Sequence, residues 1–229
     1  MSAIRDFLPF LLNGLLITLA LTAAGMVVTV VVAFAAGLCR MSHRRWLRWP
    51  AGTFIEVFRG TSMLVQLFWL FFALPFFGVQ LVPFAAAIIA LGLNEGAYGA
   101  EIVRGAITAL PRGQREGAIA LSLSPYQRMR FVVLPQAIPA MIPPFGNVMV
   151  DLLKNTSLVS LVTVADLTFR AQMVRSTTGA TTAVFATILV LYFVVSYGLS
   201  LGSGWLERRF DPARPPSRGR WGARKVARS

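Results

Sequence analysis

The sequence predicts an all-α integral membrane protein with five membrane-spanning helices and one charged helical loop between two of them. The chain has 229 residues, of which 56% are hydrophobic and only 14% charged, and its mean hydropathy is +0.66. A soluble domain would carry about 25% charged residues. The apolar residues gather in runs, several of them long enough to cross the hydrocarbon core of a bilayer. The basic residues cluster between these runs, as membrane topology requires.

Charge and cysteine content narrow the class further. The formal net charge is +13, which in a soluble protein would suggest nucleic acid, but here the placement of the arginines indicates topology and no nucleic-acid partner is expected. A single cysteine, Cys39, excludes an intramolecular disulfide. The one histidine, His43, lies in a basic loop without further ligands nearby, so we expect no metal site.

The first span is expected at about residues 13–38, after an extracytoplasmic N-terminal segment, residues 1–12. Arg5 before the run and Ala33-Phe34-Ala35 within it resemble parts of a secretory signal peptide. The hydrophobic region of a signal peptide is about 7–15 residues long, and this run is roughly twice that length. We therefore predict an uncleaved first span.

The second and third spans are expected at about 63–78 and 82–103. The basic, tryptophan-containing loop 40–50 precedes the second span, and such loops mark the cytoplasmic face. An uncharged turn separates the two spans, as a turn outside the cell can. The third span ends before Arg104, where the charged loop begins.

The fourth span is expected at about 141–164 and the fifth at about 183–205, joined by a short polar loop. Three prolines precede or open the fourth span and are expected to prevent a helix from continuing out of the charged loop: Pro139, Pro143 and Pro144. The basic tail 207–229 is rich in Arg, Pro and Gly, so we expect it to be disordered and to lie against anionic lipid.

Arginine placement predicts the orientation. The loop 40–50, the charged loop 104–139 and the tail carry several arginines each, whereas the other side carries mainly Arg5, Arg170 and Arg175. An N-terminus outside and a C-terminus inside satisfy the positive-inside rule at every turn.

The charged loop 104–139 is expected to form two short helices that meet at a tight corner. The first covers about residues 112–121. The second begins at Ser124-Pro125, because serine is a good N-cap and proline is well tolerated at the first helical position. A charged surface helix followed by a sharp bend has the shape of a docking element, and a surface loop without a partner is the alternative.

Short motifs in this loop resemble the EAA loop of ABC-importer permeases, which is the coupling helix that docks into the ATPase subunit. The matching pieces are Glu116-Gly117-Ala118, Leu121-Ser122 and Leu134-Pro135. The resemblance implies that Glu116, Gly117, Ala118, Leu121 and Ser122 couple the chain to the ATPase. Gly117 replaces the usual alanine and Ser122 the usual glycine, and a serine at 122 is strained if the corner needs a positive φ.

From Asn13 to Leu206 the chain resembles the polar amino-acid permease family. The matching segments are NGLLITLALT, EVFRGTSMLVQLFWLFFALP, AYGAEIVRGAI and LLKNTSLVSLV, and VFRGTSMLVQLFW, GLNEGAYGAEIVRGAI and DLTFRAQ most resemble ectoine/hydroxyectoine permease subunits. The family implies a type I ABC-importer transmembrane domain for ectoine, hydroxyectoine or a polar amino acid of the arginine, glutamine, glutamate or histidine type.

The same resemblance implies the partners. These are a paralogous permease that forms a heterodimer with this chain, a dimer of ATP-binding subunits and an extracytoplasmic solute-binding protein, all at the bacterial cytoplasmic membrane. The chain has no GxxxxGK[ST] phosphate loop, so ATP and Mg²⁺ are expected on the ATPase subunit. We therefore expect neither a cofactor nor an enzymatic activity in this chain.

Polar residues within the spans indicate a passage for a small charged or zwitterionic solute. We expect four of them to line it: Asn94, Glu95, Asp151 and Asn155. Charges near the bilayer centre cost about 2.5–3.5 kcal/mol on insertion scales, so they face the bundle or an aqueous cavity. Asp151 and Lys154 share a helix face and can neutralise each other, and Glu101 and Arg104 are expected to form a structural pair.

Three other interpretations remain open from the residues alone. The polar residues could form a network that only fixes helix packing. An ion-gradient-driven secondary transporter would use Glu95 and Asp151 as ion sites, but no inverted repeat is evident in the sequence. A membrane scaffold without transport would have no use for carboxylates near the bilayer centre.

Overall fold

The computed structural model describes the backbone of residues 2–210 and the side chains of residues 7–210. Within these residues every regular element is helical. The α-helices are α1 (Ser2–Arg40), α2 (Arg45–Gly60), α3 (Met63–Phe68), α4 (Pro83–Thr108), α5 (Arg112–Ala120), α6 (Pro125–Gln127), α7 (Leu134–Asn155), α8 (Leu167–Thr178) and α9 (Thr181–Phe210). The expected all-α architecture is confirmed. The prediction for residues 211–229 of the basic tail lies outside the described residues.

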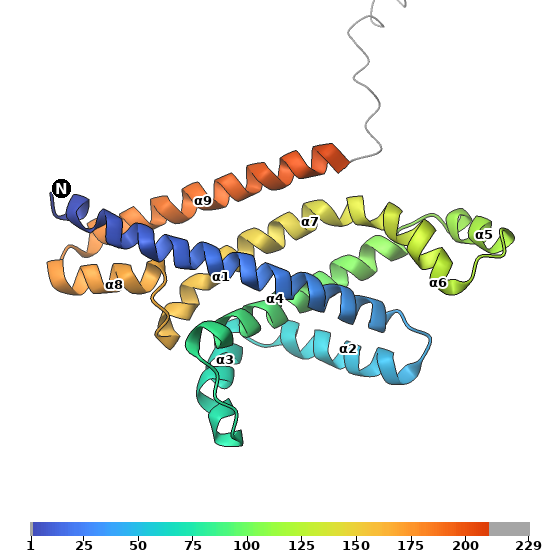
Figure 1. Ribbon diagram of the computed structural model, residues 1–229, viewed down its shortest axis with the longest axis horizontal. Coiled ribbons are helices and arrows are strands. Elements are labelled where there is room, and N and C mark those ends of the chain that lie inside the picture. Colours follow the sequence, from blue (N-terminus) through green and yellow to red (C-terminus); the bar gives the residue numbers. More distant parts are fainter. Residues whose placement is uncertain (1, 211–229) are drawn as a thin grey trace, which may run out of the picture.

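Four long helices run along the long axis of the molecule (Figure 1). They are α1, α4, α7 and α9, and α1 packs most extensively against α4. The short helices α5 and α6 lie at one end, and α8 lies at the other end beside the N-terminus. Helix α3 points away from this bundle. The elements therefore define two separate regions, the bundle interior and the α5–α6 end.

Glycines on α4 allow it to pack closely against α1. A Cβ atom at Gly92 would lie 2.4 Å from Val28 Cγ1, and one at Gly96 would lie 2.6 Å from Val32 Cγ1. Such distances are shorter than side chains tolerate. Gly92, Gly96 and Gly99 thus serve close helix approach, and α4 continues through them without unwinding.

Three helices in the described residues are long and apolar enough to cross a membrane: Phe7–Arg40, Pro125–Val162 and Thr181–Phe210. A fourth crossing arises if α2 and the segment Met63–Phe77 count as one bent span. Helix α4 is 26 residues long but carries Asn94, Glu95, Glu101 and Arg104, which lower its apolar character.

The region expected as the second span, residues 63–78, is not one straight helix. It consists of α3, a π-helical turn (Trp69–Ala73) and a 3₁₀ turn (Leu74–Phe77). It is bent by 108° from α2, which begins within the loop expected at residues 40–50. That loop was predicted too long at its second half, because the basic residues there obscured the start of a helix whose Ala51 and Ile55 face the core.

The prolines do not interrupt the fourth long helix, contrary to the sequence-based expectation. Helix α7 begins at Leu134, follows directly on a π-helical turn (Arg128–Val133) and continues through Pro139, Pro143 and Pro144. Local π geometry and side-chain donors can replace hydrogen bonds that prolines remove.

Helix α8 replaces most of the polar loop expected at residues 165–182. The Asp166 carboxylate accepts a hydrogen bond from the Phe169 N–H at 2.9 Å, and Gly179 ends the helix with φ of 68°. These are ordinary N-cap and C-terminal signals that the sequence-based interpretation missed. At the N-terminus, residues 2–12 belong to α1 and do not form a separate segment.

Candidate functional site

A polar cavity of about 540 Å³ lies between α4, α7 and the break between α2 and α3. Its polar lining comes from Asn94, Glu95 and Tyr98 on α4, Asp151, Lys154 and Asn155 on α7, and Thr61 and Ser62 at the break. All four residues expected to line a solute passage therefore meet in one cavity. Its volume falls within the range of about 300–1,000 Å³ that is typical of small-molecule sites.

Asn94 and Gln66 hold the break between α2 and α3 open toward this cavity. The Phe58 carbonyl, near the end of α2, accepts hydrogen bonds from Asn94 Nδ2 at 3.0 Å and from Gln66 Nε2 at 2.9 Å. Gln66 Nε2 also donates to Thr61 Oγ1 at 2.7 Å, and Asn94 Nδ2 donates to Gln66 Oε1 at 3.1 Å. The last carbonyls of a helix need such partners when they are withdrawn from water. The Asn94 amide is therefore engaged in a hydrogen bond to the Phe58 carbonyl and helps to define the shape of the cavity.

Glu95 lies at the buried end of the cavity. Its side chain is only 5% exposed, and Oε1 accepts a hydrogen bond from Asn155 Nδ2 at 2.8 Å. The described residues give Glu95 no salt bridge. A buried carboxylate without a cationic partner is costly, so a cationic group of a bound solute would be a favourable partner.

Asp151 and Lys154 lie at the open side of the cavity. Lys154 Nζ and Asp151 Oδ1 are 3.2 Å apart, and the two side chains are about 60% exposed. The expected pairing on one helix face is therefore confirmed. An exposed ion pair contributes little to stability. Each of the two groups can therefore leave its partner and bind a charged group of a solute with little loss of free energy.

The sequence-based interpretation missed several members of this site. Gln66, Thr61 and Tyr98 were not singled out, although Gln66 is a lone amide in the apolar segment MLVQLF. Arg59 lies over the Tyr98 ring, with its guanidinium carbon 5.2 Å from the ring centroid. The sequence signal that could have identified them is an amide or a basic side chain within an apolar run, such as Gln66 or Arg59.

Glu101 and Arg104 form the structural pair that was expected. Arg104 donates to Glu101 Oε2 from Nε at 2.9 Å and from Nη2 at 2.6 Å. Both lie on α4 toward the α5–α6 end, away from the residues that line the polar cavity.

The α5–α6 corner, defined as residues 112–127, has the geometry expected of the charged loop. Helix α5 ends in a Schellman motif, in which the Ser122 N–H bonds the Ile119 carbonyl at 2.8 Å and the Leu123 N–H bonds the Ala118 carbonyl at 3.1 Å. Ser124 begins α6 with a capping box to Gln127, as the sequence predicts.

The five expected coupling residues differ in their environment. Ala118 is buried and anchors α5, whereas Glu116, Gly117, Leu121 and Ser122 are exposed. Leu121 is 75% exposed and Ile119 56% exposed. The corner therefore presents one carboxylate beside exposed apolar side chains, a composition suited to a protein partner.

Ser122 adopts a φ of 56°, in the left-handed region that favours glycine. The sequence-based suspicion of strain at this position is confirmed. Replacing Ser122 by Gly is expected to stabilise the corner by up to about 1 kcal/mol, because glycine has no Cβ to crowd the backbone. Amide hydrogen exchange of residues 112–127 in the two proteins measures this, and faster exchange in S122G would contradict it.

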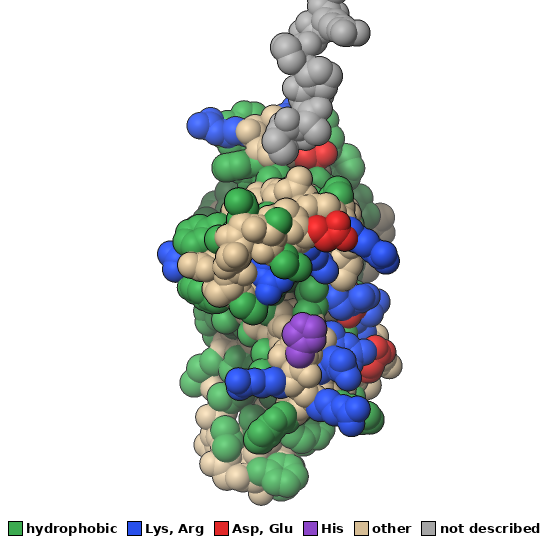
Figure 2. Space-filling view, turned by 90° about the vertical axis from the view of Figure 1, so that its right-hand side faces the viewer, with side chains coloured by type: hydrophobic (Ala, Val, Ile, Leu, Met, Phe, Trp, Pro, Cys, Tyr) green, Lys and Arg blue, Asp and Glu red, His purple; other side chains and the backbone are tan. Residues whose placement is uncertain are grey.

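Positive charge gathers at this end of the molecule. Figure 2 looks onto the end that carries α5 and shows many Lys and Arg side chains among few Asp and Glu side chains. The basic residues in the elements and connections of this end include Arg40, Arg44, Arg45, Arg48, Arg104, Arg112, Arg115, Arg128 and Arg130.

Long apolar helices, a polar cavity at a helix break and a charged external corner define an integral membrane permease. Residues 25–212 match the family of binding-protein-dependent transport system inner membrane components. The chain belongs to this family.

Curated relatives of this family include a probable amino-acid ABC transporter permease, y4tF, of Sinorhizobium fredii, which is 46% identical over 86% of this chain and 85% of its own length. The L-cystine permease TcyB of Bacillus subtilis is 36% identical over 90% of this chain and 89% of its own length. The glutamine permease GlnP of Escherichia coli is 36% identical over 91% of this chain and 96% of its own length.

Among solved structures, a chain of an amino acid ABC transporter crystallised with histidines is 35% identical and superposes with a TM-score of 0.85, covering 91% of this chain and 97% of that one. The fold is therefore that of a type I ABC-importer permease. As a permease subunit the chain is not an enzyme, and ATP hydrolysis belongs to a separate subunit. The family implies ATPase and binding-protein partners.

Proposed function

We propose that this chain carries a zwitterionic polar amino acid through the polar cavity as the permease subunit of an ATP-driven importer. The observation that carries the proposal is the meeting of Glu95, Asp151 and Lys154 in one cavity. Two carboxylates and one ammonium group complement a solute with an α-carboxylate and an α-ammonium group. Lys154 would bind the carboxylate of the solute, and Asp151 or Glu95 its ammonium group.

The α5–α6 corner is proposed to transmit motion from the ATPase. ATP binding would close the ATPase dimer and move α5 with it, through contacts with Glu116, Gly117, Leu121 and Ser122, while the buried Ala118 anchors α5 to this chain. Helices α4 and α7 would then rock and open the cavity to the side from which the binding protein delivers solute. ATP and Mg²⁺ belong to the partner subunit in this scheme, and this chain needs no cofactor.

The orientation follows from the same scheme. The arginine-rich α5–α6 end faces the cytoplasm, where the ATPase lies, and the N-terminus faces outward, as the positive-inside rule favours. The matching y4tF and y4tG permeases, both from Sinorhizobium fredii, support a heterodimer with a paralogous permease.

The substrate is proposed to be a polar amino acid, with ectoine or hydroxyectoine retained as the finer sequence-based hypothesis. The relatives named above are a probable amino-acid permease, an L-cystine permease and a glutamine permease. The hypothesis of ectoine as the solute is supported by short sequence motifs alone. All of these solutes present a carboxylate and a cationic nitrogen, so the same cavity chemistry serves each.

Uptake of labelled glutamine, arginine, cystine and ectoine tests the proposal in cells that carry this chain with its partner permease, ATPase and binding protein. We expect ATP-dependent uptake of a zwitterionic solute that persists when an uncoupler dissipates the ion gradient. Uptake lost with the uncoupler while ATP is maintained would contradict an ATP-driven importer.

In the same assay, Glu95→Gln is expected to lower uptake efficiency by roughly tenfold or more, since hydrogen bonds to charged groups are worth about 1.5–3 kcal/mol. The variant keeps an oxygen for the Asn155 amide, so the cavity retains its shape. Glu207→Gln on α9 is the matched control and should leave uptake unchanged. Equal uptake by E95Q and the parent protein would remove Glu95 from the solute site.

A further inference from the structure

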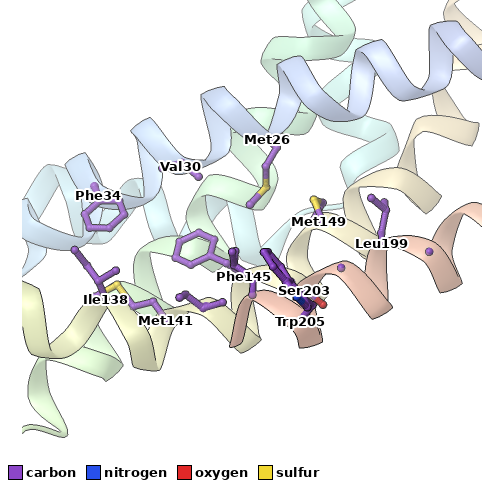
Figure 3. A pocket seen from close by; sticks show the side chains of 15 residues that line it. Met26, Val30, Phe34, Ile138, Met141, Phe145, Met149, Leu199, Ser203 and Trp205 are labelled. Carbon is purple, nitrogen blue, oxygen red and sulfur yellow. The ribbon is translucent and has the colours of Figure 1, made fainter. Parts of the chain in front are cut away.

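A second, apolar cavity of about 420 Å³ opens between α1, α7 and α9 (Figure 3). Its wall is formed almost entirely by apolar side chains, among them Val30, Phe34, Ile138 and Met149. The lining residues on α1 extend from Met26 to Phe34, which corresponds to about 12 Å along a helix axis. The cavity is therefore an elongated groove that runs along the helices, and it is separate from the polar cavity.

Small residues on α9 create the groove. Gly198 and Gly202 lie one helical turn apart in its lining, and a Cβ atom built on either would meet nothing within 4 Å. Next to them, Ser203 presses against Gly146 of α7, where an added Cβ would lie 2.5 Å from Ser203 Cβ. Helix α9 is thus held against α7 at one point, while the space beside its glycines stays open.

One end of the groove is lined by Trp205 and Leu206. Glu207, Arg208 and Arg209 follow in the last turn of α9, so this turn carries one carboxylate and two guanidinium groups. The Arg209 guanidinium carbon lies 5.5 Å from the centroid of the Trp205 ring. Tryptophan favours the level of lipid headgroups, and arginines there attract anionic headgroups.

We propose that this groove binds one anionic phospholipid, with an acyl chain between α1, α7 and α9 and its phosphate beside Arg208 and Arg209. An apolar channel that ends at a tryptophan packed against Arg209, with Arg208 in the same turn, complements the shape and charge distribution of such a lipid. The wall offers almost no polar group that could specify a protein segment. The lining residues Val30, Ile138 and Trp205 are themselves exposed, so the groove opens at the surface of the bundle, where lipid is available.

The test uses the intact transporter, reconstituted into vesicles of phosphatidylglycerol and phosphatidylcholine in equal amounts and extracted again in mild detergent. Native mass spectrometry then counts the lipids that remain bound. We expect the parent protein to retain one phosphatidylglycerol for each copy of this chain. Gly202→Leu fills the groove and should lose it, whereas Gly204→Leu, on the same helix but outside the lining, should keep it.

Arg209→Gln tests the contact with the lipid headgroup independently of the contact with the acyl chain. It should retain a lipid but lower the preference for phosphatidylglycerol over phosphatidylcholine by about fivefold, the effect of one basic residue near an anionic surface. If G202L does not assemble, Gly198→Leu repeats the test. Equal retention of lipid by G202L and G204L would overturn the proposal, and so would an unchanged headgroup preference in R209Q. A parent protein that retains no lipid because the partner permease fills the groove would overturn it as well.

Discussion

Glu116→Lys is expected to abolish ATP-coupled uptake while the chain still folds and inserts into the membrane. Glu116 is exposed on α5, and surface substitutions usually change stability by no more than about 0.5 kcal/mol. Charge reversal inside a protein interface is far more costly, about 2–5 kcal/mol where a charge pair is desolvated. We therefore expect uptake to fall at least about thirtyfold, a loss that follows from a weakened contact with the ATPase.

Two measurements made together distinguish this from a folding defect. Labelled-solute uptake reports coupling, and co-purification of the ATPase subunit with the permease reports docking. Glu207→Lys makes the same charge reversal on α9 and should leave both readouts unchanged. Normal uptake in E116K would exclude a docking role for the α5–α6 corner.

Gly92→Ala is expected to destabilise the permease by about 1–3 kcal/mol, the usual cost of overpacking a close-packed interior. Its new methyl group would lie 2.4 Å from Val28 Cγ1 and 2.6 Å from Val28 Cβ, at the tightest point between α1 and α4. Because both helices are long and pack most extensively there, neither can shift locally to relieve the contact. Thermal unfolding of the purified transporter in one detergent measures the loss.

A second substitution tests the cause. Val28→Ala removes Cγ1, the closest of the clashing atoms, but keeps Cβ, so G92A combined with V28A should recover part of the lost stability, although V28A alone destabilises. Gly105→Ala lies on the same helix with open space at its Cβ position, and it should be neutral or stabilise by up to about 1 kcal/mol. Equal melting temperatures for G92A and G105A would contradict the close packing of α1 on α4.

Much of the site could be predicted from the sequence because charge in a membrane span is expensive. Asn94, Glu95, Asp151 and Asn155 stand out from apolar surroundings, and their cost in the bilayer already indicates an enclosed polar region. Ser124-Pro125 and the Ser122 corner are local signals that depend on neighbouring residues alone, and the structure has both where they were expected.

Other features could not be predicted because they depend on contacts between distant segments. The Glu95–Asn155 hydrogen bond joins residues 60 positions apart, and the Asn94–Phe58 bond joins residues 36 positions apart. The 108° bend before α3 centres on Thr61 and Ser62, directly after Gly60 at the end of α2, and a single glycine does not indicate the angle between two helices. Gln66 and Asn94 support it by satisfying the carbonyls that the bend leaves free.

By itself, the sequence determined the membrane class, the all-helical architecture and the position of the α5–α6 corner, since hydropathy, charge placement and capping act over a few residues. Only the tertiary structure decided which polar residues share a cavity, whether α7 continues through its prolines, and where α9 leaves a groove. The shared cavity and the groove depend on how closely two helices approach, and that distance is set by side chains on both of them.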